Sequence, residues 1–434
     1  MARLAINGGP KVRTELFPSQ NTYDDAELKA VERVMKRGRL SWYRGNGTTD
    51  FYGGPEIRAL ETEWQERFNV KHAICCNSAT SGLHIATGAI GMDNYDKVIV
   101  SPYSMTCSAT IPLAWGACPV FADVESDYFC IDYASVKDHI LGASAIIAVS
   151  LFGQPFDPRL KEFKVPIIED AAQALNSIYI DPQGKLHYAG TLGDIGVYSF
   201  NFGKHLTCGE GGMIVTNNDD LALRCRLIMN HGESVIHDCT TNNENGIINP
   251  FLRKTLPSFI FGFNLRMTEI QAAIIREQLK KLPQLVIKRK INANMLRNSI
   301  DEIPPIKNAL IREGCYHSYY ALPFLWDKEL ADGLHRDVFI NAVKAELTPR
   351  IGRDTEGVPI GCGYITPIYK MPVFSGYPNE DIDQIEEYPN VEELWKNKLF
   401  LTLYHAPNST KEDMQDVIDA FEKVWEHKNE LRRE

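Results

Sequence analysis

A lysine with the surroundings of a nucleophile stands at the end of an aromatic segment. Lys204 closes the run Tyr-Ser-Phe-Asn-Phe-Gly-Lys that begins at Tyr198, and a glycine cluster follows at 209–212. An amine in apolar surroundings loses its proton at little cost and can then attack a carbonyl carbon. A solvated surface lysine is the alternative.

Two acidic residues follow an apolar stretch. Glu169 and Asp170 come directly after Ile167 and Ile168. A carboxylate at the end of a buried strand is costly unless a cation or an N–H group partners it. A functional partner, a structural ion pair and a helix N-cap all fit this pattern.

Two further segments carry small or polar groups at the start of a helical pattern. Asn77-Ser-Ala-Thr-Ser-Gly82 precedes a helical run at 83–90, where free N–H groups and the helix dipole suit a phosphate. Simple N-capping by Ser78 or Thr80 is the alternative. Asn264 and Arg266 lie among aromatic residues before a second helix, and a capping or turn arrangement would also explain them.

Together these groups favour one cofactor, pyridoxal phosphate (PLP). PLP needs a lysine for its Schiff base, an acid that keeps the ring nitrogen protonated, and an anion cradle for its phosphate. The protonated ring withdraws electrons, so the α-proton of an amino acid can leave. The freed lysine amine then moves that proton between carbons.

These groups need a sheet to bring them together. β-rich apolar runs occur at 72–76, 98–100, 119–122, 145–151, 165–168, 195–200 and 213–216. Helical segments separate the first four runs. This alternation predicts an α/β domain with a mostly parallel sheet covered by helices, in which ligands bind beyond the carboxyl ends of the strands.

Changes of pattern along the chain predict three parts. We expect an N-terminal arm at 1–25, a large cofactor-binding domain at 26–284 and a smaller α+β domain at 285–434.

Two helices have clear start signals. Thr268 and Gln271 form a capping box, and Pro283 should end that helix. Ser409 and Glu412 should form the capping box of the last helix.

Composition excludes several classes of function. The chain of 434 residues carries 46 basic and 56 acidic residues, a net charge of −10, so nucleic acid and membrane surfaces are poor partners. Its ten cysteines include no C-x-x-C pair, which indicates free thiols in a cytoplasmic protein with no metal site. The uncharged stretches 98–122 and 140–156 contain prolines and glycines and predict core segments, not membrane spans.

The run Tyr-Ser-Phe-x-x-x-Lys-x-x-Thr-x-Gly-Glu-Gly-Gly at 198–212, with the segments 168–174 and 262–273, resembles the DegT/StrS family of PLP-dependent sugar and aminocyclitol aminotransferases. The resemblance covers most of the chain. It implies the aspartate-aminotransferase fold (type I), with a mostly parallel seven-stranded sheet in the large domain.

The resemblance also assigns residues. Lys204 would bind the cofactor covalently, Asp170 would pair with the pyridinium nitrogen, and Gln173 would lie beside the 3-hydroxyl, where many relatives have His. Asn264 would reach the phosphate of the neighbouring subunit's cofactor, which implies a homodimer with shared active sites. The remaining cofactor contacts would come from Ala79, Thr80, Ser81, Met105, Ser199 and Asn201.

Some positions depart from the family pattern or vary within it. Met105 takes the place of an aromatic residue over the cofactor ring, and a thioether can pack on a π-face. Ser150 stands where relatives often have His. The segment 238–255 has no assignment. The resemblance places substrate contacts in variable loops, at Trp42, Tyr43, Arg44, His231 and Tyr369.

The function that we expect is transfer of an amino group from L-glutamate or L-glutamine to a keto group of a sugar or cyclitol. The opening segment 4–10 resembles that of scyllo-inosose aminotransferases. A nucleoside-diphosphate ketosugar is the alternative acceptor, with Arg44 and Lys370 available to its pyrophosphate. A PLP-binding regulator without catalysis is an alternative of another class. A dehydratase branch of the family has His in place of the lysine, and position 204 is Lys.

Overall fold

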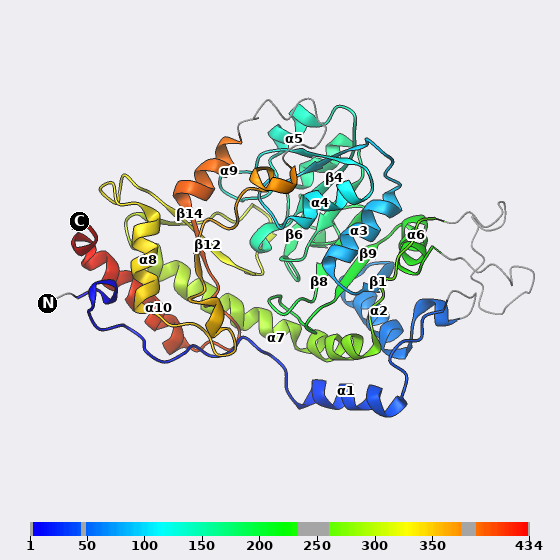
Figure 1. The fold of residues 1–434 in the computed structure, drawn as a ribbon, viewed down its shortest axis with the longest axis horizontal. Coiled ribbons are helices and arrows are strands. Elements are labelled where there is room, and N and C mark those ends of the chain that lie inside the picture. The colour runs from blue at the N-terminus through cyan, green and yellow to red at the C-terminus, as the bar shows by residue number, and fades with distance from the viewer. Residues whose placement is uncertain (1–2, 45–48, 233–259, 375–387, 433–434) are drawn as a thin grey trace, which may run out of the picture.

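The computed structural model describes residues 3–44, 49–232, 260–374 and 388–432. A large helix-covered sheet occupies one side of the molecule and a smaller α+β part the other, and the long helix α7 (Glu269–Ile300) runs between them (Figure 1). The segment 238–255, which had no assignment, lies outside the described residues.

The large sheet has seven strands in the order β1-β9-β8-β5-β4-β2-β3. β9 alone runs antiparallel to its neighbours, so the prediction of a mostly parallel sheet is confirmed. All strands except β9 therefore end at the same edge. The strands are β1 (His72–Cys76), β2 (Lys97–Val100), β3 (Cys118–Phe121), β4 (Ala143–Val149), β5 (Ile167–Asp170), β8 (Ile195–Ser199) and β9 (Gly212–Thr216).

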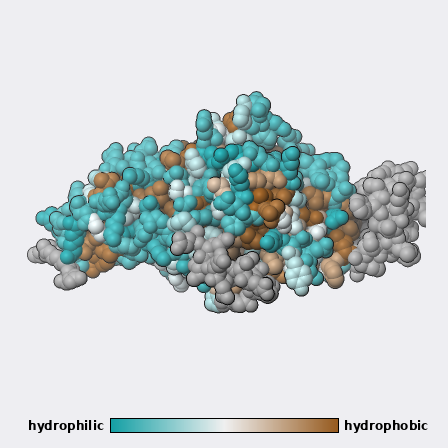
Figure 2. Space-filling model, turned by 90° about the horizontal axis from the view of Figure 1, so that it is seen from above, coloured by the Kyte–Doolittle hydropathy of each residue, from teal (hydrophilic) through white to brown (hydrophobic). Residues whose placement is uncertain are grey.

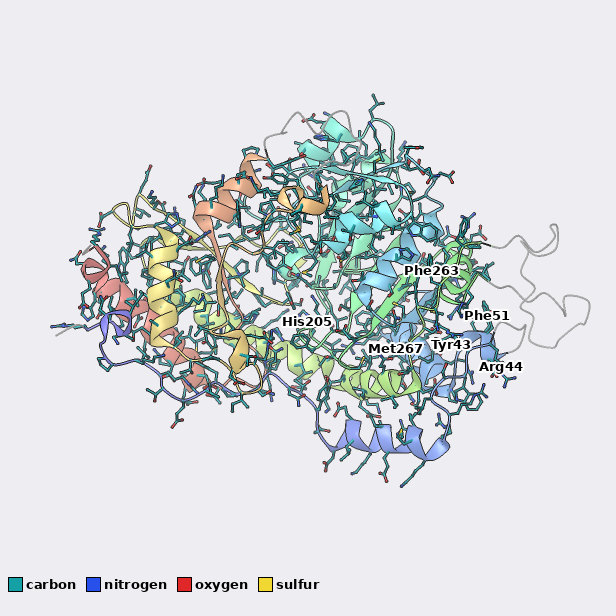
Figure 3. The ribbon with its side chains drawn as sticks, viewed as in Figure 1. Tyr43, Arg44, Phe51, His205, Phe263 and Met267 are labelled. Atoms are coloured by element: carbon teal, nitrogen blue, oxygen red, sulfur yellow. The ribbon has the colours of Figure 1, made fainter. Side chains whose placement is uncertain are left out.

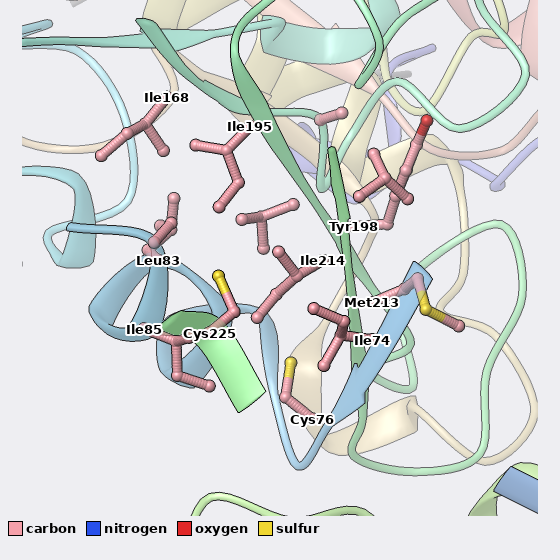
Figure 4. Packing of buried hydrophobic residues seen from close by; sticks show 14 of the residues in the cluster. Ile74, Cys76, Leu83, Ile85, Ile168, Ile195, Tyr198, Met213, Ile214 and Cys225 are labelled. Atoms are coloured by element: carbon pink, nitrogen blue, oxygen red, sulfur yellow. The ribbon is translucent and has the colours of Figure 1, made fainter. Parts of the chain in front are cut away.

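Helices cover both faces of this sheet. The larger core forms between one face and α2 (Pro55–Phe68), α3 (Ala79–Ile90), α6 (Asp219–Met229) and the first half of α7. Figure 4 shows Leu83 and Ile85 of α3 and Cys225 of α6 packed near the strand residues. The second core packs α5 (Tyr133–His139) against the other face. Helix α4 (Cys107–Ala114) joins β2 to β3. Burial on both faces explains why the strands read as nearly continuous apolar runs.

The C-terminal part contains a four-stranded antiparallel sheet in the order β10-β12-β14-β13. Its core includes residues from α8 (Arg336–Glu346), α10 (Lys411–Glu426) and the second half of α7. The strands are β10 (Ile306–Asn308), β12 (Leu322–Trp326), β13 (Ile360–Cys362) and β14 (Leu399–Thr402). A third sheet, which the sequence did not indicate, pairs β11 (Cys315–Tyr316) with β6 (Ile178–Ile180) and β7 (Leu186–Tyr188).

The prediction that Pro283 ends its helix is wrong. Helix α7 begins at the expected Thr268 capping box but continues through Pro283 to Ile300. The proline ring is exposed, while Leu282 and Val286 on either side are buried in the large core. Burial of an apolar face on both sides of a proline outweighs the loss of one hydrogen bond. The expected domain boundary at 284/285 falls inside this helix, which contributes to both cores.

The capping box of the last helix is one residue later than predicted. Thr410 caps α10 and Asp413 returns the bond, whereas Ser409 Oγ donates to the Tyr404 carbonyl (2.7 Å) and accepts from Arg350 Nη2 (3.1 Å). Two hydroxyl residues in sequence each precede an acidic residue by three positions, so the spacing alone cannot distinguish them.

The N-terminal arm contacts the C-terminal part before reaching α1 (Asp25–Arg37). Leu4 and Phe17 are buried in the core of the C-terminal part, and Arg13 pairs with Asp413 and Asp416 at 2.7 Å.

α9 (Pro389–Glu393) precedes β14. The face in Figure 2 is mostly hydrophilic, with its main apolar area right of the middle and smaller ones elsewhere. Within the described ranges no helix has the length and apolarity needed to cross a membrane.

Candidate active site

The carboxyl edge of the large sheet collects the residues that the sequence singled out. β1 leads into the Ser78 segment, β5 ends at Asp170, and β8 leads through Ser199 to Lys204. These three strands share one direction, so residues separated by more than 100 positions meet at one edge. The charge of Lys204 lowers the pKa of Asp170, so the two side chains are close enough to interact electrostatically.

The two adjacent acids have different surroundings. Both are buried, but Glu169 is fully partnered. It accepts from Ser150 Oγ (3.0 Å) and from the N–H groups of Leu192 and Gly193 (3.0 and 3.3 Å). Ser150, which replaces the usual His, thus has a structural role. Glu169 supports the fold and leaves Asp170 as the acid available for chemistry.

Asp170 has too few partners for a buried carboxylate. Its side chain is bonded to the Ala172 N–H (3.0 Å) and to the Ser108 hydroxyl, and no ion pair to it occurs within the described part of the chain. Only 4% of the residue is exposed, and burial raises the pKa of the carboxyl above its ordinary value. The charge of Lys204 lowers this pKa but forms no ion pair with Asp170 in the described ranges, so the buried acid can still take a close cationic partner.

Lys204 lies over an aromatic ring that the sequence did not single out. Its Nζ is 4.3 Å from the centre of the Tyr320 ring, which comes from the segment before β12. The next residue, His205, is buried and its Nε2 lies 3.2 Å from the Ser318 carbonyl. Burial, together with the nearby Arg289, holds the pKa of His205 well below its usual range. His205 is therefore a neutral anchor that ties the Lys204 loop to the C-terminal part.

Helix α3 offers free donors at its N-terminus. Ser78 Oγ accepts from the Ser81 N–H (3.0 Å) and caps the helix, as the alternative interpretation expected. The N–H groups of Ala79 and Thr80 have no partner within the described ranges, and Thr80 is exposed. The cap satisfies only part of the first turn, so N–H groups suited to an anion remain beside it.

Gln173 is held by groups from both parts of the molecule. Its Oε1 accepts from the Phe152 N–H (2.9 Å), and its Nε2 donates to Tyr364 Oη (2.8 Å). Burial raises the pKa of the Tyr364 phenol well above its ordinary value, and Asp170 and Tyr320 also act on it. Tyr364 therefore faces the same site.

The start of α4 completes the wall of the site. Burial and the nearby Asp170 raise the pKa of the Cys107 thiol to about 11, and Thr80 hydrogen-bonds the same thiol. Met105, in the place of the usual aromatic residue, is half exposed. Sequence reasoning missed Cys107, Ser108 and Tyr320 because none of them stands in a recognisable pattern.

A second group of predicted residues forms around Arg266. Its Nε donates to Asn264 Oδ1 (2.8 Å), its Nη1 donates to Asn230 Oδ1 (3.0 Å), and its guanidinium lies 5.8 Å from the Tyr43 ring. Asn230 Nδ2 also donates to the carbonyl of Arg44 (3.4 Å). We call Tyr43, Arg44, Asn230, Asn264 and Arg266 the Asn264 group.

The Asn264 group lies beside the start of α3, because the N–H of Asn77 donates to the carbonyl of Leu265 (2.9 Å). His205, the neighbour of Lys204, lies away from Tyr43, Arg44 and Phe263 in Figure 3. The N–H of His231 donates to the Phe263 carbonyl (2.9 Å), which places His231 beside the group. Trp42 stacks under Arg39, with 4.0 Å between the guanidinium and the ring.

Tyr369 belongs to neither group. Its hydroxyl bonds Glu392, and its ring packs on those of Tyr388 and Phe121. Lys370, the lysine considered for a pyrophosphate, pairs with the same carboxylate at 2.6 Å and shares it with Lys396. No cluster of potential metal ligands occurs in the described ranges.

The residues present fit PLP. An under-partnered buried acid suits a pyridinium, two free N–H groups at a helix N-terminus suit a phosphate, and Lys204 stands on the loop beside them. Gly212 adds to this fit, because a Cβ there would lie 2.7 Å from the Ser78 carbonyl at the start of α3.

Comparison with known proteins agrees with this geometry. Residues 25–422 match the model of the DegT/DnrJ/EryC1/StrS aminotransferase family. The chain is 27% identical over 453 residues to the L-glutamine:2-deoxy-scyllo-inosose aminotransferase of Streptomyces kanamyceticus, covering 98% of each chain. It is 37% identical over 243 residues to the GDP-perosamine synthase of Caulobacter vibrioides, covering 55% of this chain and 60% of that protein.

A solved structure extends the likeness to the whole fold. The X-ray structure of the aminotransferase from Psychrobacter cryohalolentis superimposes with a TM-score of 0.79 at 26% identity. The match covers 95% of this chain and 99% of that chain.

Proposed function

The chain belongs to the DegT/DnrJ/EryC1/StrS aminotransferase family, and from this premise we propose that it aminates a keto group of a cyclitol or sugar, with L-glutamine or L-glutamate as donor. It is a PLP-dependent aminotransferase, and bound PLP supplies the electron sink for proton removal from the donor. Names of relatives that act on scyllo-inosose compounds support a cyclitol acceptor.

The observation that carries the proposal is the state of Asp170. This buried carboxylate forms no ion pair within the described ranges and lies at the same sheet edge as Lys204 and the start of α3. Asp170 would hold the proton on the cofactor's ring nitrogen. Lys204 would hold the cofactor and carry a proton on its Nζ, and the N–H groups of Ala79 and Thr80 would bind the phosphate.

The remaining predicted contacts keep their proposed roles. Ser81 lies in the first turn of α3 and Ser199 is the last residue of β8, and their hydroxyls would bind the phosphate. Asn201 steadies the Lys204 loop, because its Oδ1 accepts from the Gly203 N–H (3.2 Å) and its Nδ2 donates to Glu210 (2.9 Å). Met105 would pack on the cofactor ring.

A half-reaction tests catalysis. Addition of L-glutamine or L-glutamate to the PLP-loaded protein should convert the visible absorbance of the cofactor to that of its amine form. An unchanged spectrum with both donors would favour the PLP-binding regulator instead.

A nucleoside-diphosphate ketosugar is a second candidate acceptor. The likeness to a GDP-perosamine synthase favours it, and Arg44, which is exposed and pairs with Asp50 at 3.6 Å, could turn to a pyrophosphate. Assays of amine transfer to free keto-cyclitols and to nucleotide-linked ketosugars would show which class of acceptor the enzyme uses. Competitive inhibition by GDP or TDP would support the nucleotide-linked acceptor and contradict the cyclitol.

We also propose a homodimer in which the Asn264 group of one subunit completes the cofactor site of the other. Two apolar surfaces support this. Phe202, beside Lys204, is 50% exposed, and Phe261 and Phe263, beside Asn264, are 84% and 40% exposed. Such exposed aromatics are typical of an interface.

Subunit mixing tests the shared site. Lys204→Ala and Asn264→Ala should each be inactive alone. Their mixed dimers should regain activity at roughly one quarter of all sites, because random mixing makes half of the dimers heterodimers with one intact site each. No recovery in mixtures that do exchange subunits would contradict the shared site.

The cytoplasm is the proposed location, because all nine cysteines in the described ranges are free. We retain the division into an arm, a large domain and a small domain as a proposal, with α7 shared between the two domains.

A further inference from the structure

The amide of Gln173 has a fixed orientation. An amide side chain can turn over and exchange its oxygen for its nitrogen unless neighbours distinguish the two ends. Here the Phe152 N–H can only donate, so it selects the Gln173 oxygen (2.9 Å). The opposite end must then be the NH2 group, and Tyr364 Oη accepts one of its two hydrogens (2.8 Å).

Both neighbours are themselves held in place. The Tyr364 N–H donates to Tyr103 Oη (2.7 Å), and the Tyr364 ring contacts the Phe152 ring edge-on, with centroids 5.1 Å apart. Phe152 has a left-handed backbone (φ 57°), and its carbonyl accepts from the Tyr320 N–H (3.0 Å). Tyr320 is the residue whose ring lies under Lys204. One chain of contacts thus runs from Lys204 to Gln173 and Tyr364.

We propose that Tyr364 is a positioning residue that keeps the second Nε2–H of Gln173 directed at the ring oxygen of the cofactor. Glutamine does not titrate, so it donates from the same NH2 group at every working pH, whereas a histidine would change its charge and its number of N–H donors. The role of Tyr364 rests on the proposed placement of the cofactor between Lys204 and Asp170. The hydrogen bond between Tyr364 and Gln173 also links the segment after β13 to the large domain.

Tyr364→Phe is the variant that tests this. The ring remains, so its packing on Phe152 and Tyr103 is preserved. We expect the dissociation constant for PLP to rise roughly three- to tenfold, the effect of one lost hydrogen bond. We also expect the midpoint of the pH titration of the visible absorbance to move upward, because the donor favours the form with negative charge on the ring oxygen.

A double-mutant cycle with Gln173→Ala identifies the route. If Tyr364 acts through Gln173, Tyr364→Phe should add nothing to PLP affinity or to the titration midpoint in the Gln173→Ala background. Tyr320→Phe is the matched control, since it removes a phenol from the same site that makes no bond to Gln173; its effect should add to that of Gln173→Ala.

Two results would overturn the proposal: an unchanged titration midpoint in Tyr364→Phe, or equal effects of Tyr364→Phe with and without Gln173. If Tyr364→Phe fails to fold, Gln173→Ala alone must still move the midpoint upward, and no movement would refute the role. Labelling of Lys204 by borohydride in the wild type separates this outcome from failure of the proposed function, because the latter would leave Lys204 unlabelled.

Discussion

Asp170→Asn should distinguish the effect of this residue on the stability of the cofactor-free protein from its effect on PLP affinity. The substitution keeps the shape of the side chain, and its Oδ1 can still accept from the Ala172 N–H. In the protein without cofactor, burial raises the pKa of Asp170 above its ordinary value. The stabilisation from this shift is present below the ordinary pKa of an aspartate and is lost as pH rises through the raised pKa. Cofactor-free Asp170→Asn should therefore be at least as stable as the wild type at neutral pH.

In the PLP-loaded protein, by contrast, we expect Asp170→Asn to be unfavourable, because it weakens cofactor binding. Removing one partner of a buried charge pair costs about 3 to 5 kcal/mol. At about 1.4 kcal/mol per factor of ten, PLP should bind roughly a hundred- to a few-thousand-fold more weakly. Thermal unfolding of the cofactor-free proteins against pH, and titration with PLP followed by absorbance, measure the two effects. PLP affinity within threefold of the wild type, or a cofactor-free variant destabilised by more than about 2 kcal/mol, would refute the assigned role.

Three other substitutions test local features. Gly212→Ala should displace the start of α3, because its Cβ would lie 2.7 Å from the Ser78 carbonyl. We expect PLP to bind at least roughly fivefold more weakly in a titration. The control Gly361→Ala, which has open space around its Cβ, should bind PLP like the wild type. Thr410→Ala should lower the free energy of unfolding by about 1 kcal/mol in denaturant, and an unchanged midpoint would contradict the cap. Pro283→Ala should raise the melting temperature, with a gain of up to about 3 kcal/mol, since the helix continues through this position; a loss of stability would mean that the proline is favoured there.

The chemistry of the site was predictable where it follows the strands. Lys204 and Asp170 could be found because a polar group directly after a buried strand is costly, and the shared direction of the strands brings such groups together. Tyr320 and the bond from Gln173 to Tyr364 could not be found, because both tyrosines come from the C-terminal part, and no spacing relates them to the large sheet. Their place depends on how the two parts pack, which a local pattern does not encode.

Errors in the element boundaries have the same origin. Pro283 lies inside a helix because both flanking faces are buried, so tertiary packing prevails over a local stop signal. Ser409 was preferred to Thr410 as the cap because both hydroxyls precede an acid by three residues. The Ser409 hydroxyl instead bonds Arg350, which is distant in the sequence, and the carbonyl of Tyr404. A rule based on the spacing of capping residues detects neither partner.

Covalent attachment of the cofactor to Lys204 is the most direct test of the account. Borohydride reduction of the PLP-loaded protein, followed by digestion and mass spectrometry, should find the reduced cofactor on the peptide that contains Lys204 and on no other lysine. Labelling at a different lysine, or stoichiometric PLP binding without any labelled peptide, would contradict the assignment of this site.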